Sequence, residues 1–392
     1  MGAKVLEDLK QHRNHVLLLI LTGICVKFAL FFFAWAFPVA PIGQMMGVKP
    51  EFLSINLNNS SSDTIPLDAK IRRAFDTAVY IDIAQEGYSE VPGRTKFLMY
   101  SSSLSASTCA HMWLFLYPLA IRLLASLVGF VASAILASNF FSLTSTILLY
   151  FVALKYVDDS SAFRAAILFL LYPQNLAYGT GGYSEPLFMT FVLSAWLLLE
   201  QNILLCGVLI MLASLTRYFG LLLFPLFALI NAARKLPDKE LKKAAADGIL
   251  LHLFALPLLY WLFIQVPNDT GISFSQIESM CAHVSFGIPG SSLLFLQPIG
   301  AFFLYASIIA VWQLWKNNKI LAGYSIVFLL SFMSINGLTA VSIGRYIGII
   351  WPLFIFYGRY FAWKDTLVLS AGFFLLGAIM FIFHVNLIPT TF

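Results

Sequence analysis

Charged side chains are scarce in this sequence. Only 11% of its 392 residues are Asp, Glu, Lys or Arg, whereas 60% are hydrophobic and the mean hydropathy is +0.84. Soluble globular domains carry about 25% charged residues, so the composition excludes that class. Apolar runs of roughly 20 residues recur from one end of the chain to the other, and each is long enough to cross a bilayer as a helix. The sequence therefore predicts an all-α polytopic membrane protein.

The sequence also lacks the motifs of several common chemistries. It contains no P-loop, dinucleotide fingerprint, nucleophile elbow or zinc-binding His-Glu helix. No basic stripe with interleaved aromatic residues is present either. The net charge of +5 is then better explained by basic cytoplasmic loops than by a nucleic-acid partner.

The four cysteines are scattered and show no metal-ligand spacing. Cys25 and Cys206 fall inside predicted spans, where a small buried thiol is the simplest interpretation. Cys109 and Cys281 fall in predicted outer loops, and a disulfide between them stays open. The sequence demands no cofactor, and it leaves a divalent metal open because no ligand cluster requires one.

The expected topology is a single integral membrane domain, residues 1–392. A first span covers 16–37, and basic residues before it place the N-terminus in the cytoplasm. Residues 38–124 form a long extracytoplasmic loop with short helices, ending in an interfacial helix near 111–124 that is interrupted by Pro118 and Arg122. The remaining spans lie within 131–386, which makes about eleven transmembrane helices with the C-terminus outside.

One segment has two interpretations. As a single span, residues 203–230 would place the basic stretch that follows them outside. As two short helices that meet at Leu215, Thr216 and Arg217, they return that stretch to the cytoplasm and remove Arg217 from mid-membrane. The second interpretation is preferred. The other predicted spans are 131–154, 163–178, 186–199, 248–265, 297–315, 320–337, 346–362 and 366–386.

This topology places seven charged or titratable side chains at the outer face. They are Asp76, Asp82, His111, Glu185, Arg217, His283 and Arg345. Asp76, near the start of a helical stretch, is a candidate general base. The alternatives for Asp76 are a favourable interaction with the helix dipole or an ion pair with Arg72 or Arg73. Asp82 lies about 120° round that helix, and a solvated loop charge is its simpler interpretation.

Two further groups of outer residues are candidates for substrate binding. Glu185 follows Tyr183 and Ser184 at the start of a span, where either a helix cap or a binding role fits. Arg217 and Arg345 each lie beside a tyrosine at a span end, and an arginine fork suits a phosphate. Snorkelling to lipid headgroups is the alternative for both.

Two other residues have weaker sequence signals. His111 is a further candidate for substrate binding, against the alternative of a structural or exposed loop histidine. Lys27 falls in mid-span, so it faces either the bundle interior or a carboxylate partner.

Five segments, taken together and in order, resemble the PIG-V family, the GPI mannosyltransferase 2-like glycosyltransferases, most closely its microbial members. The segments are FDTAVYIDIAQEGY, LFLYPLAIRLL, LYPQNLAYGTGGYSEPLF, LASLTRYFGLLLFPLF and GRYIGIIWPLF, between Phe75 and Phe356. The departures are Phe75 where tryptophan is usual, Phe115 where proline is common, and Tyr218-Phe219 after Arg217. These departures concern the choice of acceptor more than the reaction class.

The resemblance implies a GT-C-type bundle whose active site faces the extracytoplasmic side. It implies transfer of a sugar, most commonly mannose, from a polyprenyl (dolichyl) phosphate donor to a lipid- or protein-linked glycan acceptor, in membrane lipid and without nucleic acid. Asp76 would be the catalytic carboxylate, with Glu185, Arg217 and Arg345 in motif positions. A prokaryotic cell membrane is favoured over the ER membrane. The alternative is a transporter or flippase of a lipid-linked or anionic substrate, although no inverted repeat supports it.

Overall fold

The computed structural model describes residues 11–36, 67–72, 74–88, 106–235, 237, 239–276, 290–334 and 344–385. Within these ranges the chain forms 18 α-helices, one 3-10 helix and one π-helix, and no strand. The predicted all-helical class is confirmed for this part of the chain.

Among the fully described helices, five helical stretches are long and apolar enough to cross a membrane. They are α2 (Arg13–Ala36), α9 (Phe130–Ala153), η3 with α14 (Tyr218–Lys235), α15 through α17 (Leu241–Thr270) and α23 (Trp363–Val385). Helices satisfy all their interior backbone groups within the segment, which is what a bilayer requires of a spanning element. The fold therefore suggests a multi-pass membrane protein.

The remaining helices complete the described part of the chain. They are α5 (Leu67–Ile71), α6 (Phe75–Glu86), α7 (Ala106–Ala110), α8 (Leu116–Val128), α10 (Asp159–Leu171), α11 (Pro173–Thr180), α12 (Glu185–Leu198), α13 (Ile203–Thr216), α19 (Gly290–Asn317), α20 (Lys319–Ser334) and α22 (Pro352–Tyr360). Within the long stretches, the separate elements are η3 (Tyr218–Leu222), α14 (Leu223–Lys235), α15 (Leu241–Leu253), α16 (Leu256–Tyr260), η4 (Trp261–Gln265) and α17 (Val266–Thr270).

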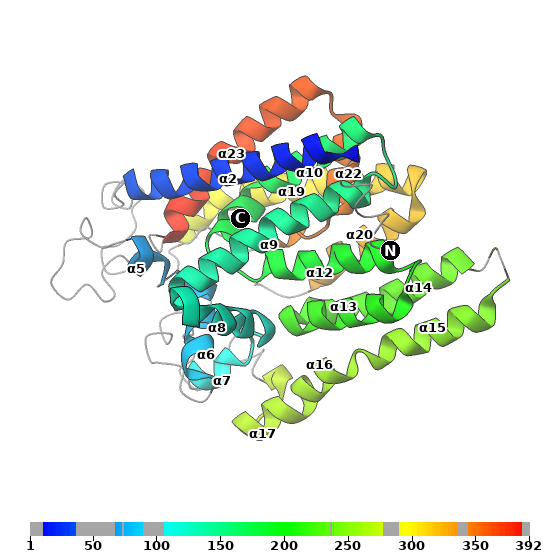
Figure 1. The fold of residues 1–392 in the computed structure, drawn as a ribbon, viewed down its shortest axis with the longest axis horizontal. Coiled ribbons are helices and arrows are strands. Elements are labelled where there is room, and N and C mark those ends of the chain that lie inside the picture. Colours follow the sequence, from blue (N-terminus) through cyan, green and yellow to red (C-terminus); the bar gives the residue numbers. More distant parts are fainter. Residues whose placement is uncertain are drawn as a thin grey trace.

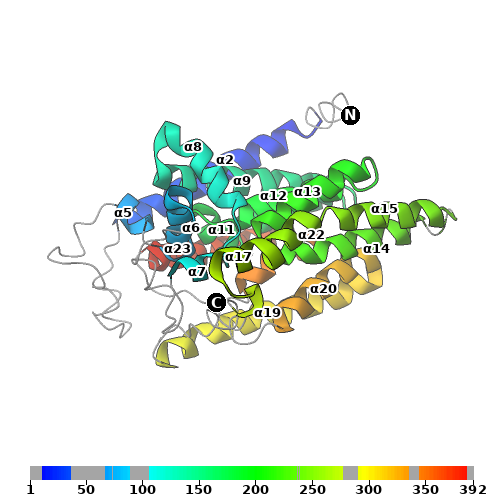
Figure 2. The ribbon, with the colours of Figure 1, turned by 90° about the horizontal axis from the view of Figure 1, so that it is seen from below.

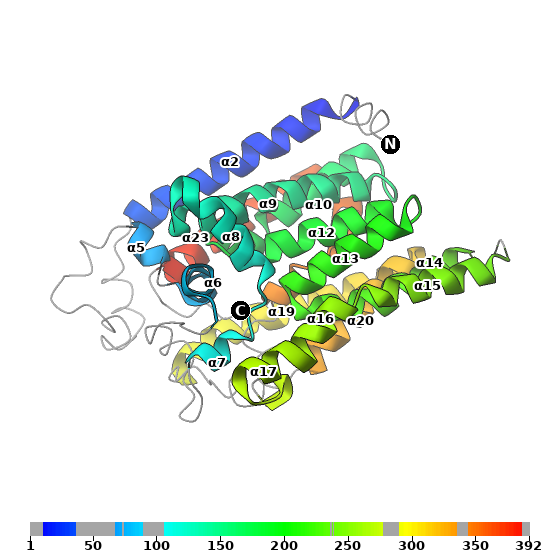
Figure 3. The same cartoon turned by 60° about the horizontal axis from the view of Figure 1, so that its bottom comes forward.

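The longer helices run roughly along the long axis of the molecule (Figure 1). Helices α5, α6 and α7 gather at one end, on the left of Figure 1, and the end of α14 and the start of α15 lie at the other (Figures 1, 2 and 3). These ends are called the α6 end and the opposite end below.

The predicted break at Arg217 is confirmed. Helix α13 ends at Thr216, Arg217 has an extended backbone (φ −148°, ψ 130°), and η3 and α14 follow. The ion pair between Arg234 and Glu200, 2.8 Å, shows that the chain turns back, because Glu200 precedes α13 and Arg234 ends α14. A Cβ on Gly220 would lie 2.3 Å from the Ser214 Cα atom, so glycine allows this tight return.

The predicted single span 163–178 is wrong in detail. The structure divides it into α10 and α11 at Tyr172, whose backbone is extended (ψ 126°). Pro173 explains the division, since proline disfavours a helical conformation in the residue before it and cannot donate a helix hydrogen bond. The predicted span 346–362 is shortened in the same way, because its helix α22 begins at Pro352.

The interior of the bundle is rich in aromatic side chains. Trp196 of α12 packs edge-on against Trp351, with ring centroids 4.7 Å apart, and both side chains are buried. Tyr324 of α20 lies against both tryptophans. Edge-to-face pairs of this kind add to the stabilisation from burial alone, so they fix α12 and α20 relative to the chain that enters α22.

Candidate functional site

Four charged side chains from distant parts of the sequence meet at the α6 end. Asp76 lies in the first turn of α6, Glu185 begins α12, Arg217 follows α13, and Arg345 lies in the short helical segment 344–347. These four residues are called the charge cluster. All four were predicted from sequence to lie at one face, and the structure brings all four into contact.

Glu185 is the centre of the charge cluster. Its Oε1 atom forms an ion pair with the Arg217 Nη1 atom, at 3.0 Å, and accepts a hydrogen bond from the Arg345 Nε atom. The Glu185 side chain is only 9% exposed. An isolated buried carboxylate is very costly, and paired cations offset that cost, so the two arginines and Glu185 depend on one another.

Arg345 joins both carboxylates. Its Nη2 atom lies 2.7 Å from the Asp76 Oδ2 atom, and its Nε atom contacts Glu185. The guanidinium also lies over the rings of Tyr183, at 4.5 Å, and Tyr178, at 5.1 Å. The contacts of its guanidinium with two carboxylates and two ring faces hold Arg345 in one orientation. The Arg217 and Arg345 side chains are both largely buried against their carboxylate partners, so neither extends toward lipid headgroups. Tyr183 therefore contacts the charge cluster through Arg345, and its role in substrate binding stays a prediction.

Ser184 does not cap α12, which corrects one of the two interpretations from sequence. Its side chain makes no capping hydrogen bond. Instead, its Oγ atom shares a hydrogen bond of 2.6 Å with Tyr80 and accepts one of 3.1 Å from Arg217. Ser184 thus ties α6 to the charge cluster.

The glycines before Ser184 have a packing explanation. Gly182 has φ +90°, and a Cβ there would lie 2.9 Å from the Thr77 methyl group. Thr77 donates a hydrogen bond of 2.7 Å to the Gly181 carbonyl. The close backbone approach expected from sequence is therefore an approach by α6, and it holds Asp76 beside Glu185.

The interpretation of Asp82 as a solvated charge is wrong. Its side chain is 0% exposed and forms an ion pair with Arg72. Arg72 also donates to the Gln85 side chain, at 2.9 Å. Arg72 therefore forms its ion pair with Asp82 and not with Asp76, as one sequence alternative had it. The other alternative partner of Asp76, Arg73, lies outside the described residues.

His111 lies apart from the charge cluster. It is buried, its Nε2 atom is 3.5 Å from the Asp269 carboxylate, and its ring packs against Tyr88 and Trp261. These contacts are with residues outside the charge cluster, and its binding role stays a prediction. The neighbouring Cys109 is disulfide-bonded.

The remaining cysteines and Lys27 are placed as follows. Cys25 and Cys206 are free thiols; Cys206 is buried as expected, but Cys25 is exposed, so its interpretation as a buried thiol is wrong. Cys281 lies outside the described residues. Lys27 faces the bundle interior, where its Nζ atom donates to the Gly179 carbonyl, at 3.1 Å, and lies 3.4 Å from the Thr180 hydroxyl.

Two features bear on what the charge cluster could bind. The Arg217 Nε atom is buried and has no hydrogen-bond partner among the described residues, which leaves one strong donor available. Asp76 is the more exposed carboxylate, at 23% of its side-chain area against 9% for Glu185. In the part of the chain that the structure describes, no three His, Cys, Asp or Glu side chains are placed to hold a metal ion.

Sequence reasoning missed the polar residues behind the charge cluster. Gln174 is buried at the start of α11, and Ser142, Ser145 and Thr146 are buried on α9. The available signal was the spacing of the α9 residues at three and four positions, which puts them on one helix face. Small polar residues are common in transmembrane helices, so that spacing alone did not distinguish them.

Fold and site together define a class of protein: an all-helical protein of membrane type with a buried, nearly neutral group of two carboxylates and two arginines at one end. No family model matches the chain, and no curated protein matches it either.

Proposed function

We propose that the protein is a membrane glycosyltransferase of GT-C type that transfers a sugar, most commonly mannose, from a polyprenyl phosphate donor to a lipid- or protein-linked glycan. One observation carries the proposal: Arg217 and Arg345 lie in one cluster with Asp76. Phosphate binding needs fixed cations, and attack by a hydroxyl needs a base close to them. The charge cluster provides both.

The two arginines have different roles in this proposal. Arg345 already contacts Asp76 and Glu185, so it orients the carboxylates. Arg217 keeps its Nε donor unpaired, so it takes the phosphate oxygen of the donor. A charge-assisted hydrogen bond from a preorganised donor stabilises the charge that develops on a leaving phosphate.

Asp76 is the base in the proposed reaction. The acceptor hydroxyl oxygen forms a bond to the anomeric carbon while the bond from that carbon to the phosphate oxygen breaks, and the bonding pair leaves with the phosphate. The hydroxyl proton passes to Asp76, and the anomeric configuration inverts. Asp76 is suited to reach an acceptor because its side chain is the more exposed of the two carboxylates.

The α6 end is the extracytoplasmic face in this proposal. Several helix ends away from the charge cluster carry basic side chains: Lys155 donates to the Leu197 carbonyl and Arg234 pairs with Glu200. Lys316 and Arg359 adjoin Asn317 and Tyr360, whose side chains are hydrogen-bonded. Cytoplasmic loops carry such an excess of lysine and arginine. The observation supports a cytoplasmic opposite end and a site that opens outside the cytoplasm, in a prokaryotic or an ER membrane.

A transfer assay tests the proposed function. Purified protein is incubated with radiolabelled polyprenyl phosphate mannose and glycolipid acceptors. We expect transfer by the wild type and a loss of about 100-fold or more in Asp76→Asn, because one general base contributes about 10²–10⁴-fold. Glu200→Gln, at the opposite end, is the matched control and should retain activity.

Two outcomes would contradict the proposal. Undiminished transfer by Asp76→Asn would remove Asp76 as the base. Absence of transfer with every donor, together with flux of the lipid-linked substrate in liposomes, would replace the enzyme by a transporter.

A further inference from the structure

A small polar cavity lies directly behind the charge cluster, between α9, α11 and α12. Its volume is about 20 Å³, and a buried water needs about 10–15 Å³ measured in this way. Glu185 and Arg345 form its boundary with the charge cluster. Its other polar lining residues are Ser142, Ser145, Thr146, Gln174 and Asn175.

Gln174 is the most unusual of these residues. It is 1% exposed, and neither its Oε1 nor its Nε2 atom has a hydrogen-bond partner among the described residues. Buried polar atoms are almost always paired, and an unpaired one carries its full desolvation penalty. One side chain with both an unpaired donor and an unpaired acceptor therefore requires a ligand that supplies both.

The Glu185 Oε2 atom also lacks a partner. It is buried and has no hydrogen-bond partner among the described residues, while both arginines contact the Oε1 atom. A carboxylate oxygen accepts hydrogen bonds only, so its missing partner must be a donor. The cavity thus needs one molecule that donates to Glu185 and can both donate to and accept from Gln174.

The hydroxyl groups on α9 and the Asn175 side chain on α11 offer further acceptor oxygens to the cavity. Ser145 and Thr146 each donate their hydroxyl proton to the Ser142 carbonyl, at 3.1 and 2.8 Å. The Asn175 amide group donates to the Phe169 and Gly348 carbonyls. Their remaining lone pairs can accept a hydrogen bond from a ligand in the cavity.

A cation does not meet these requirements. It would satisfy the oxygens but leave the Gln174 Nε2 donor unpaired, and it would lie beside the Arg345 guanidinium, which also lines the cavity. A water molecule donates twice and accepts twice, so it suits Gln174 and Glu185 at once. Buried waters in proteins make about three such bonds.

We propose that this cavity is a binding site for an ordered water molecule, which pairs with both ends of the Gln174 amide and with the second oxygen of Glu185. The water is then a third partner of Glu185 beside the two arginines, and Gln174 is the residue that keeps it there. This inference does not depend on the proposed transferase activity.

The sign of a stability change tests the proposal. Gln174→Leu removes both amide atoms at similar side-chain length. If a water pairs with Gln174, its loss should lower Tm by about 1–2 °C, because the shift that one lost net hydrogen bond gives becomes smaller as the chain becomes longer. If the cavity is dry, the same change removes two unpaired polar atoms and Tm should rise. A rise would overturn the proposal.

Two further measurements keep the test independent of packing and of ion binding. Met189→Leu alters an apolar lining residue and leaves every polar atom in place, so its shift measures repacking alone and should be smaller. Tm of the wild type should also be equal in NaCl, KCl and choline chloride, and a rise specific to one cation would overturn the water assignment in favour of an ion site. High-resolution density should show one water beside Gln174, and density consistent with a dry cavity would contradict the proposal.

Discussion

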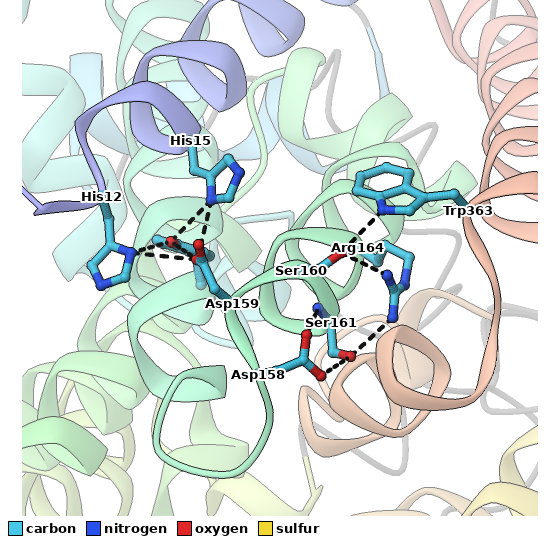
Figure 4. Close-up of polar contacts among 9 residues, drawn as sticks. His12, His15, Asp158, Asp159, Ser160, Ser161, Arg164 and Trp363 are labelled. Atoms are coloured by element: carbon cyan, nitrogen blue, oxygen red, sulfur yellow. Dashed lines mark hydrogen bonds and ion pairs between the residues drawn. The ribbon is translucent and has the colours of Figure 1, made fainter.

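Two polar clusters at the two ends of the molecule join distant segments in different ways. At the α6 end, guanidinium groups hold the carboxylates of the charge cluster. At the opposite end, imidazole groups do so: His12, just before α2, and His15, in its first turn, approach Asp159, which begins α10 (Figure 4). The His12, His15, Tyr150 and Asp159 side chains are called the histidine cluster.

The histidine cluster has the weaker kind of partner. The Asp159 Oδ1 atom lies 3.3 Å from the Nδ1 atom of His12 and 3.1 Å from that of His15. Tyr150 also donates to Asp159, and its hydroxyl is 2.7 Å from His12. Histidines are charged only when protonated, whereas arginine is charged at every relevant pH.

The two clusters also differ in how deeply their carboxylates are buried. The Asp159 side chain is 49% exposed, whereas that of Glu185 is 9% exposed. Removing one partner of a buried ion pair is far more costly than removing one at the surface. The comparison indicates that the charge cluster is built to hold charge without water, and that the histidine cluster fastens the start of α2 to α10.

Replacement of Glu185 should have the largest effect. Glu185→Gln leaves two buried arginines with one carboxylate less, and we expect a loss of about 3–5 kcal/mol in the free energy of unfolding. Glu200→Gln is the control, because Glu200 pairs with Arg234 at 2.8 Å but is 57% exposed; its cost should be below about 1 kcal/mol. Thermal and denaturant unfolding in detergent measure both. Equal losses would show that burial does not distinguish the pairs.

The turn that carries Arg217 should be the next most sensitive feature. Gly220→Ala would place a Cβ 2.3 Å from the Ser214 Cα and 2.6 Å from its backbone nitrogen, so the backbone must shift. We expect a cost of about 1–3 kcal/mol, as for other overpacked sites. Gly372→Ala on α23 meets nothing within 4 Å and should be neutral or stabilising, since alanine favours a helix. A neutral Gly220→Ala would contradict the described turn.

The histidine cluster should give the smallest effect, and one that depends on pH. Burial opposes ionisation of Asp159, but hydrogen bonds from Tyr150 and His15 outweigh it and lower the pKa of the carboxyl group below its ordinary value. Its contribution is therefore present above the ordinary carboxyl pKa of about 3.9 and is lost as the pH falls through the lowered value. Asp159→Asn should cost less than about 1 kcal/mol near pH 6.

A pH series checks that expectation. The stability difference between wild type and Asp159→Asn should shrink as the pH falls below about 4. A difference that stays constant down to acid pH would show that the carboxylate charge contributes nothing. The charge cluster should not show a comparable change at neutral pH, because its cations are arginines.

Hydropathy and charge scarcity were enough to predict several features. They located most of the helices, and they placed Asp76, Glu185, Arg217 and Arg345 at one face because charges in an apolar chain are rare and must share the few polar sites. The break at Arg217 followed from the same reasoning.

Other contacts depend on how each helix is rotated, which periodicity does not specify. The prediction that Asp82 is solvated was wrong for this reason, because the orientation of α6 buries its carboxylate against Arg72. Ser184 has the sequence of a cap but bonds to Tyr80 of α6. The histidine cluster forms where the start of α2, the end of α9 and the start of α10 meet, and periodicity does not specify how helix ends meet. Gln174 could not be distinguished from other polar residues because its environment comes from three helices.

The proposal that the charge cluster binds the donor phosphate is tested most directly by measuring the binding of a polyprenyl phosphate to purified protein. The Arg217→Gln variant is compared with the wild type and with Arg234→Gln, which changes an arginine at the opposite end. Loss of one charge-assisted hydrogen bond should weaken binding by about tenfold to a hundredfold in Arg217→Gln. Both variants must remain folded, as judged by their unfolding transitions, and Arg234→Gln should bind as the wild type does. Equal affinity of all three proteins for the lipid phosphate would contradict the assignment of the charge cluster as the donor site.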